Sequence, residues 1–341
     1  MGKDREPTIY AVAERAGVSK SVVSRVVSGR GSVSLSARER VLTAADDLGY
    51  RVNLTAQALR SGRGQLVGLL LRSSVSPFYG RLMYELQREA SAENARLVAV
   101  TGNLDDASER EALETLLELR VAAVIIGSGR IPAAVVNDVA ARVPTIMIER
   151  EQGSVLTDIV GFDGTLVGRE TVERLWDAGH RAVYFFDHLL SASAVPRRVG
   201  FMSAAEERGL HVTVVDAGYD YIPGLVVASR TFAELRNNPA ISAVVTLGHE
   251  AAEAVLETAA QLKVSVPGDL TVVTLALPDE ALSGQWDLTG FRSDTAELAG
   301  AVWSLLRSRL ADPDRPTSAV AVPRHLHEGN TFGAATASVM R

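Results

Sequence analysis

The sequence has 341 residues, of which 47% are hydrophobic and 22% are charged, so it encodes a globular protein of two or three domains rather than a disordered chain. It contains no cysteine, which excludes disulfides, cysteine nucleophiles and cysteine-based zinc sites. No apolar run approaches the roughly 18 residues of a membrane span, and the N-terminus, MGKDREPTIY, lacks the apolar stretch of a secretory signal. We therefore expect a cytoplasmic protein with no membrane partner.

The net charge of −6 is divided unevenly along the chain. Residues 1–64 carry 11 Lys and Arg against 6 Asp and Glu, a net of +5, whereas the remainder carries 24 (35 − 11) against 35 (41 − 6), a net of −11. A basic segment on an acidic body favours a polyanionic partner for that segment alone. The alternative is the small charge excess that many domains carry by chance.

Three short helices are predicted within the first 50 residues. Thr8 caps the first, IYAVAERA, which Gly17 ends, and Ser19 caps the second, KSVVSRVVS. The third is predicted to start at Ser36, in a capping box with Glu39. The apolar residues available for a shared core are Ile9, Val12, Ala13, Ala16, Val22, Val23, Val26, Val27, Val41, Leu42, Ala45 and Leu48. Three such helices, with a tight turn after the first, indicate a helix-turn-helix unit.

The second helix carries the chemistry of this unit. A helix fits the major groove of DNA, and residues near its N-terminus reach base edges. Lys20, Ser21 and Arg25 are hydrogen-bond donors, and Arg or Lys pairs well with guanine, while Ser19 and the helix N-terminus suit a phosphate oxygen. An ordinary solvated helix face is the alternative.

Residues 53–64 are predicted to form a hinge helix and linker. Asn53 can cap the segment LTAQALRS. An exposed Leu59 suits a wedge between base steps in the minor groove, and Gln57 and Arg60 can meet phosphates. Packing of Leu59 on a partner helix or on the body is the alternative.

From Gln65 onward, apolar runs alternate with amphipathic segments. The predicted strands are LVGLLLR, ARLVAVT, AAVIIGS, PTIMIE, DIVGFD, AVYFFD, HVTVVD, SAVVTLG and LTVVTLA. This alternation predicts parallel sheets buried by helices on both faces. The predicted strands are more than one sheet of an ordinary domain holds. We therefore expect two such sheets, with a ligand cleft between them.

The segments TIYAVAERAGVSKSVVSRVVSGRGSVS, RERVLTAADDLGYRVN and AQALRSG resemble the LacI/GalR family of bacterial transcription regulators, and the resemblance continues through the body to about residue 330. It implies an N-terminal all-α helix-turn-helix head (1–52), a hinge helix with linker (53–64) and an α/β two-subdomain core like periplasmic binding proteins (65–341). The subdomains are expected at about 65–162 plus 291–322 and at about 163–290 plus 323–341. The implied crossovers lie near Gly161–Asp163, Thr289–Ser293 and Pro323.

The resemblance assigns roles in the head. It implies Lys20 and Ser21 as variable base readers, Arg25 as an additional groove contact, and Leu59 as the hinge leucine that kinks the operator centre. Ala11 stands where the family usually has Asp. The start of the first helix should therefore be less stable, by about 0.5–1 kcal/mol. The candidate DNA-binding residues are Thr8, Ser19, Lys20, Ser21, Ser24, Arg25, Asn53, Gln57, Leu59 and Arg60.

Candidate effector-binding residues follow the predicted strands of the body. Phe78 and Tyr79, after the first strand, suit stacking on a ligand ring, or ordinary packing. Arg197 matches the family's arginine that grips ligand hydroxyls or carboxylates, with a surface arginine as the alternative. Asp163 matches the first residue of the family's Asp-Asn pair, whose second residue is here Gly164.

Two further positions depart from the family. Gly248-His249 stands where an Asn-Asp pair is usual, and Ala276 replaces the usual acceptor carboxylate. An apolar cleft floor cannot satisfy a polyhydroxyl ligand, because each unpaired polar group costs about 1–3 kcal/mol. We expect either a less polar or differently held effector, with His249 or Glu250 contributing, or weakened sensing. An ordinary histidine at a helix N-terminus is the alternative for His249.

The last predicted helix has an apolar stripe, formed by Leu298, Val302, Leu305 and Leu306, that suits either core packing or a dimer face. The sequence has no phosphate loop, dinucleotide fingerprint or nucleophile elbow, and its HLHE segment fits an edge strand, so no enzyme, cofactor or metal site is expected. The sequence therefore predicts a homodimeric repressor of a pseudo-palindromic operator in double-stranded DNA, controlled by a small-molecule effector. The alternatives are a regulator with a lost or atypical effector response, and a solute-binding protein, which the basic head disfavours.

Overall fold

The computed structural model describes residues 7–28, 32–50, 66–74, 76–102, 105–127, 131–149, 156–187, 194–217, 221–235, 240–277 and 286–335. The chain divides into two compact units, Met1–Gly64, here called the head, and Gln65–Arg341, here called the core. In the part of the chain that is described, no helix is both long and apolar enough to cross a membrane.

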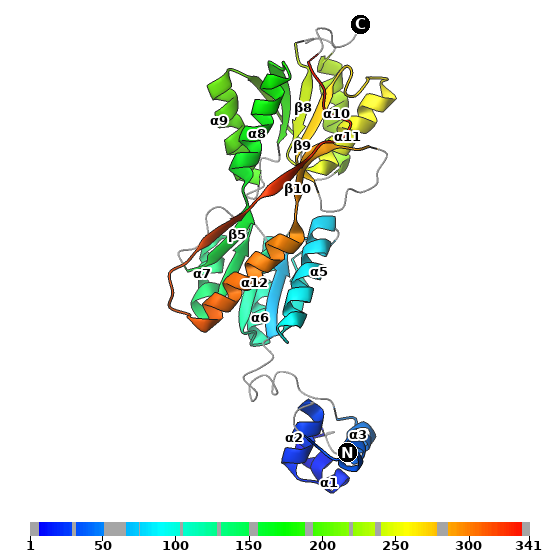
Figure 1. The fold of residues 1–341 in the computed structure, drawn as a ribbon, viewed down its shortest axis with the longest axis vertical. Coiled ribbons are helices and arrows are strands. Elements are labelled where there is room, and N and C mark those ends of the chain that lie inside the picture. The colour runs from blue at the N-terminus through cyan, green and yellow to red at the C-terminus, as the bar shows by residue number, and fades with distance from the viewer. Residues whose placement is uncertain are drawn as a thin grey trace. The chain divides into compact units, whose positions relative to one another are not determined.

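The head contains three helices, α1 (Ile9–Ala16), α2 (Lys20–Ser28) and α3 (Leu35–Asp47), packed around buried valines and alanines (Figure 1). The predicted ends of α1 are confirmed. The Thr8 hydroxyl accepts a hydrogen bond from the Ala11 N–H at 3.3 Å, and Gly17 adopts the left-handed φ of 64° that ends the helix.

The predicted start of α3 was wrong. The N-cap is Ser34 rather than Ser36, because it is the Ser34 hydroxyl that accepts from the Ala37 N–H, at 3.4 Å. Leu42 was also wrongly placed in the core, since it is 53% exposed. Val41 and Ala44, three residues apart, face α1 and α2 and turn the neighbouring Leu42 toward solvent.

The core consists of two α/β lobes. The sheet of the first lobe has the strand order β11-β5-β4-β3-β1-β2, and every neighbouring pair is parallel. Its strands are β1 (Leu66–Leu71), β2 (Arg96–Thr101), β3 (Ala123–Gly127), β4 (Thr145–Ile148), β5 (Asp158–Phe162) and β11 (Ala319–Val322). Helices α5 (Pro77–Ala92) and α12 (Thr295–Ala311) bury one face, and α6 (Asp106–Glu118) and α7 (Ala133–Arg142) bury the other.

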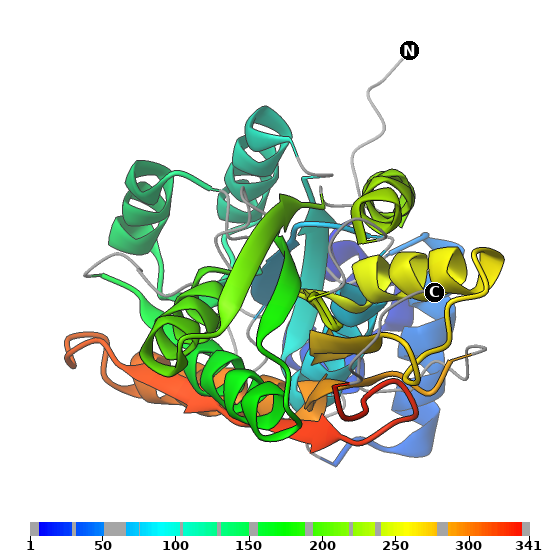
Figure 2. The same ribbon diagram turned by 90° about the horizontal axis from the view of Figure 1, so that it is seen from above.

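The sheet of the second lobe has the order β12-β10-β9-β8-β6-β7. Its strands are β6 (Ala182–Asp187), β7 (His211–Asp216), β8 (Ala243–Thr246), β9 (Thr271–Leu277), β10 (Thr289–Ser293) and β12 (Arg324–His327). Helices α8 (Gly164–Asp177) and α9 (Val195–Arg208) cover one face, and α10 (Tyr221–Leu235) and α11 (His249–Gln261) cover the other. In the view from above, α8 lies beside the red strand β12 (Figure 2).

Two features of the core differ from the expectation: the direction of one strand and the position of one boundary between the lobes. Strand β12 pairs antiparallel with β10, because β10 leads out of the second lobe and β12 leads back into it. The chain passes between the sheets after β5 at Asp163, after β10 at Asp294 and between β11 and β12 at Pro323. The boundary expected at about residue 291 therefore falls inside β10, all of which pairs within the second sheet.

The apolar stripe of α12 packs inside the first lobe. Leu298, Val302 and Leu306 are each at most 1% exposed and belong to the core that α12 shares with α5, while Leu305 packs at its margin. Of the two roles considered for the stripe, core packing is the one that the structure shows.

Candidate functional site

The candidate DNA-reading face of the head is the polar side of α2. Val23 and Val26 point into the head core, so the side chains at the intervening positions turn outward. Ser21, Ser24 and Arg25 are exposed, as the sequence predicted, and the Arg25 Nε donates to the Ser21 carbonyl at 3.3 Å. This face presents hydroxyl and guanidinium donors near the start of a helix, which is the chemistry that base edges and phosphates require.

Lys20 is held by an aromatic partner that the sequence patterns did not single out. Its Nζ donates to the Tyr10 hydroxyl at 2.9 Å and lies 4.6 Å from the centre of the Tyr10 ring. Tyr10 is 63% exposed. Tyr10 lies outside the apolar stripe of α1, so its position on the helix excludes a role in the core. An exposed aromatic residue at such a position is the signal that could have identified it. The reading face therefore includes the phenol of α1 as well as α2.

The structure says less about the other candidate DNA-binding residues of the head. Ser19 lies just before α2, and its hydroxyl shares a hydrogen bond of 2.8 Å with the Ser21 hydroxyl. Thr8 is occupied as the cap of α1. The four candidates in the predicted hinge helix, Asn53, Gln57, Leu59 and Arg60, lie outside the described residues.

A cleft of about 280 Å³ lies between the two lobes of the core. It is lined by residues of β5 and β11 from the first lobe and by the starts of α8, α9 and β12 from the second. The lining residues with ionisable side chains are Glu149, Asp163, Arg197 and Arg324. The cleft thus opens where the chain crosses between the sheets, as expected for an open α/β fold.

Two of the predicted effector residues, Asp163 and Arg197, line this cleft. The Asp163 Oδ1 accepts from the Leu166 N–H at 3.0 Å and so caps α8. Arg197 is 9% exposed and lies against the start of α8, where a Cβ on Gly164 would be 3.0 Å from its Cγ. Gly164, where the family usually has Asn, is therefore explained by the close approach of α9 to α8.

Glu149 and Arg324 form a pair across the cleft that the sequence patterns did not reveal. The Arg324 Nη2 lies 3.6 Å from Glu149 Oε2, and its guanidinium stacks 4.3 Å from the centre of the Phe162 ring. The Arg324 Nη1 also donates to Ser293 Oγ at 2.6 Å, and Glu149 Oε1 accepts from the Phe162 N–H at 2.9 Å. The pair joins the end of β4 in the first lobe to the start of β12 in the second. Glu149 was detectable as a carboxylate at the carboxyl end of a predicted strand.

The other predicted effector residues are not among the residues that line the described part of this cleft. Phe78 and Tyr79 contact each other edge to face at 5.2 Å and pack on the first-lobe core. His249 starts α11, with its Nδ1 3.2 Å from a Glu250 carboxylate oxygen. Ala276 lies in β9, where its N–H donates to Thr274 Oγ1 at 3.4 Å.

Comparisons with known proteins match both units of the chain. The model of bacterial regulatory proteins of the lacI family matches residues 8–53, and the model of periplasmic binding proteins and the sugar binding domain of the LacI family matches residues 65–283. The HTH-type transcriptional regulator PtxS of Pseudomonas plecoglossicida is 29% identical over 225 residues, which are 65% of this chain and 66% of that protein. The regulator AscG of Escherichia coli is 30% identical over 208 residues, 60% of this chain and 62% of AscG. The chain thus aligns with slightly less than two thirds of both relatives.

Solved structures show the same fold. The Lac repressor dimer bound to operator and the anti-inducer ONPF superimposes with a TM-score of 0.80 at 22% identity, covering 97% of this chain and 100% of the repressor chain. A LacI family regulator from Silicibacter pomeroyi superimposes with a TM-score of 0.77 at 24% identity, covering 95% and 99% of the two chains. Since the larger family model alone spans more than half of the chain, the protein belongs to the LacI family of bacterial regulatory proteins.

Proposed function

We propose that this protein is a sequence-specific DNA-binding transcription regulator, acting as a homodimeric repressor of a pseudo-palindromic operator. The observation that carries the proposal is the exposed donor face of α2, with Ser21, Ser24 and Arg25 outward and Lys20 held at its edge by Tyr10. The excess of basic residues in residues 1–64 supports it, because phosphate neutralisation supplies much of the affinity for DNA.

The homodimer and the repressor role are inferred from relatives. The Lac repressor structure that superimposes on this chain is a dimer on its operator. Two heads related by a two-fold axis read two half-sites about one helical turn apart or a multiple of it, which is why the operator should be pseudo-palindromic. A solute-binding protein needs no such head, and the matched relatives are transcriptional regulators, so we infer neither transport nor catalysis for this chain.

The operator is found by enriching randomised double-stranded DNA on the full chain and sequencing the bound fraction. We expect a pseudo-palindrome, and we expect the Arg15→Ala variant to recover the same sequence. Arg15 is a matched control because it is an exposed arginine of α1, not of α2, and pairs with Asp47 of α3 at 2.9 Å. Recovery of unrelated sequences with no common motif would refute sequence-specific binding.

We further propose that the cleft binds a small effector that is held by charged groups rather than by a network of sugar-hydroxyl acceptors. The Asp163 carboxylate already caps α8, and Glu149 is the other carboxylate among the described residues that line the cleft. Arg197 and the Glu149–Arg324 pair remain as the other charged groups among the described residues that line the cleft. One solved relative, the regulator CelR, is in complex with cellobiose, so a sugar is the natural comparison.

A thermal-shift screen tests this proposal for the cleft. The compounds are sugars, nucleosides, less polar metabolites and charged metabolites. We expect shifts with charged metabolites that disappear in the Arg197→Lys variant, because Lys cannot reproduce the planar fork of donors. A clear shift with an unmodified hexose would contradict the proposal that charged groups hold the effector.

A further inference from the structure

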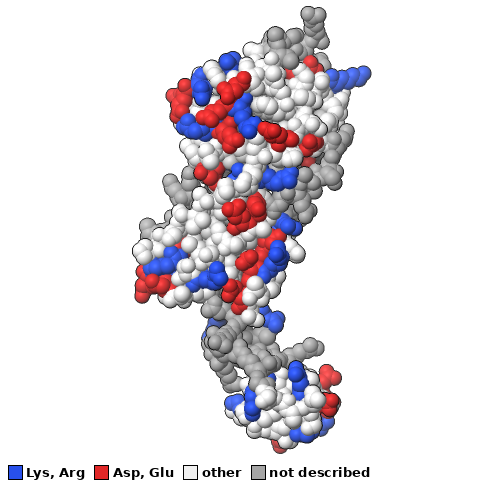
Figure 3. Space-filling model, viewed as in Figure 1, with Lys and Arg blue, Asp and Glu red and all other residues white. Residues whose placement is uncertain are grey.

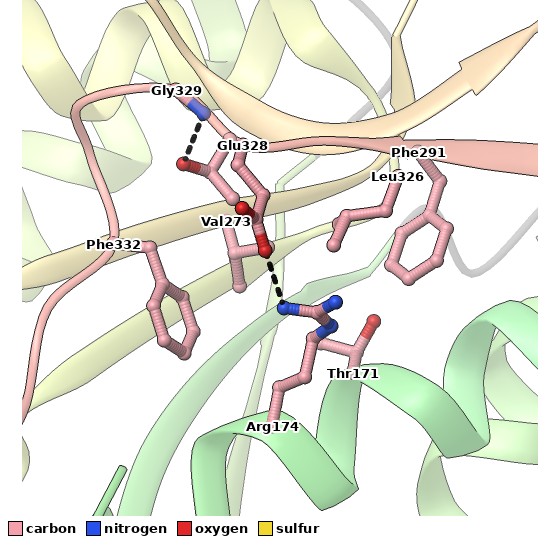
Figure 4. Close-up of a pocket in the computed structure, with 9 residues that line it drawn as sticks. Thr171, Arg174, Val273, Phe291, Leu326, Glu328, Gly329 and Phe332 are labelled. Atoms are coloured by element: carbon pink, nitrogen blue, oxygen red, sulfur yellow. Dashed lines mark hydrogen bonds and ion pairs between the residues drawn. The ribbon is translucent and has the colours of Figure 1, made fainter.

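The second lobe contains a separate cavity of about 220 Å³ between α8 and the strands β9, β10 and β12 (Figure 4). Among the described residues, none that lines this cavity also lines the cleft between the lobes. Four apolar side chains form its walls: Val273 of β9, Phe291 of β10, and Leu326 and Phe332 of the segment that begins with β12. A cavity of about 150 Å³ lined by Leu, Ile and Phe accepts benzene. This cavity therefore has room for one six-membered aromatic ring with a short substituent.

The mouth of the cavity carries a guanidinium. Arg174 on α8 extends along the cavity toward Glu328, with its Nη1 3.1 Å from Glu328 Oε1, and its Nε donates to Glu170 at 3.3 Å (Figure 4). The Glu328 side chain is 74% exposed, so its ion pair with Arg174 is a solvated one and contributes little to stability. On the face of this lobe seen in Figure 3, charged side chains of both signs are interspersed, most of them on the left side of the view.

We propose that this cavity is a second ligand site, which binds a small aromatic monocarboxylate. The ring lies among the four apolar side chains, and the carboxylate takes the place of Glu328 as the partner of Arg174. The planar fork of Arg suits a carboxylate, and a carboxylate held beside the apolar walls forms a stronger hydrogen bond than the exposed Glu328 does. A neutral aromatic amide of the same shape gains the ring contacts but only a weaker hydrogen bond from Arg174, because its carbonyl oxygen carries no full charge.

Calorimetric titration of the full chain with benzoate and with its neutral isostere benzamide tests the site. We expect benzoate to bind more tightly than benzamide. Arg174→Gln should weaken benzoate binding at least about tenfold and benzamide binding much less, because the hydrogen bonds to benzoate are the charge-assisted ones. Glu328→Gln should strengthen benzoate binding, because the carboxylate that competes for Arg174 is gone.

Arg169→Gln is the matched control. Arg169 lies on the same helix, its side chain is 40% exposed like that of Arg174, and it is ion-paired with Glu207 at 2.7 Å, but it does not line the cavity. It should leave benzoate binding unchanged. Leu326→Trp, which fills the cavity, should abolish binding of both probes.

Three results would overturn the inference. Equal affinity for benzoate and benzamide would remove the role of Arg174, and so would equal losses in Arg174→Gln and Arg169→Gln. Loss of benzoate binding in Arg197→Lys, with Arg174→Gln unaffected, would place the carboxylate in the cleft instead. Arg174 and Glu328 are at least 40% exposed, so their variants fold and keep the test decisive if Leu326→Trp does not. Because the readout is binding to the protein alone, failure here leaves the proposed DNA-binding function untouched.

Discussion

Replacement of Asp158 by Asn should destabilise the core more than any surface substitution. The Asp158 carboxylate is fully buried at the start of β5. Its Oδ1 accepts from the Ser318 N–H at 2.8 Å and from Arg309 Nη2 at 3.1 Å. Its Oδ2 accepts from Arg309 Nε at 2.9 Å and from Arg315 Nη2 at 2.7 Å. This one carboxylate fixes the segment that leads from α12 to β11, and residues 319–321 of β11 line the cleft.

The size of the stability loss for Asp158→Asn follows from the two arginines that the substitution leaves without their carboxylate. The Arg309 and Arg315 side chains are only 9% and 16% exposed, so an amide at position 158 leaves two nearly buried guanidinium groups without a counter-charge. Breaking a buried ion pair in this way costs about 3–5 kcal/mol. Since both guanidinium groups lose their one carboxylate partner, we expect a loss in that range for Asp158→Asn.

Urea unfolding of the full chain, followed by circular dichroism, measures this loss as a change in the free energy of unfolding at constant slope. Asp138→Asn is the control, because Asp138 is 66% exposed and 3.6 Å from its partner Arg142, and it should change stability by less than about 0.5 kcal/mol. A loss of less than about 1 kcal/mol for Asp158→Asn would refute the reasoning.

Two further predictions concern the second lobe and its helices. A Cβ on Gly168 would lie 2.4 Å from two backbone atoms of α9, so Gly168→Ala should lower stability by about 1–3 kcal/mol in thermal denaturation. Gly300→Ala, on a helix where a Cβ meets nothing within 4 Å, should not lower it, and equal losses would contradict the close approach of α8 and α9. Burial lowers the pKa of His180, whose neutral ring accepts from the Ser242 hydroxyl at 2.7 Å and donates to the Gly333 carbonyl at 3.0 Å. Since the unfolded chain then takes up this proton at a higher pH than the folded chain, stability should fall as the pH drops below about 6.5, and His180→Gln should show a shallower fall. Identical profiles of stability against pH for the unmodified chain and the His180→Gln variant would exclude protonation of His180 as the cause of the fall.

Much of the fold was predictable because it depends on neighbouring residues. The caps of α1 at Thr8 and Gly17 follow from residue type at a helix end, and the alternation of apolar runs with amphipathic segments sets the two sheets. The start of α3 was missed because both Ser34 and Ser36 precede an apolar run, and only the backbone decides which hydroxyl reaches an N–H. The antiparallel β12 was missed because its direction depends on the crossover at Pro323 and not on its own residues.

The candidate sites were predictable only in part. Exposed donors on α2 follow from helical spacing against the buried valines. The pairing of Lys20 with Tyr10 joins two helices, and the Glu149–Arg324 pair joins residues far apart in the chain, so no local pattern reveals either. The cavity beside Arg174 is likewise formed by four separate segments. The identity of a ligand-facing residue therefore depends on long-range packing that spacing alone does not encode.

The central claim is that the head reads DNA sequence through α2, and a comparison of Arg25→Ala with Arg15→Ala tests it most directly. Affinity for the enriched operator and for random DNA is measured for both variants and for the unmodified chain, from about 50 to 200 mM salt. We predict that operator affinity of the unmodified chain falls steeply with salt. Arg25→Ala should cost about 1–3 kcal/mol on operator and much less on random DNA, while Arg15→Ala leaves the ratio unchanged. A flat salt response, or equal losses on operator and random DNA for Arg25→Ala, would contradict the account.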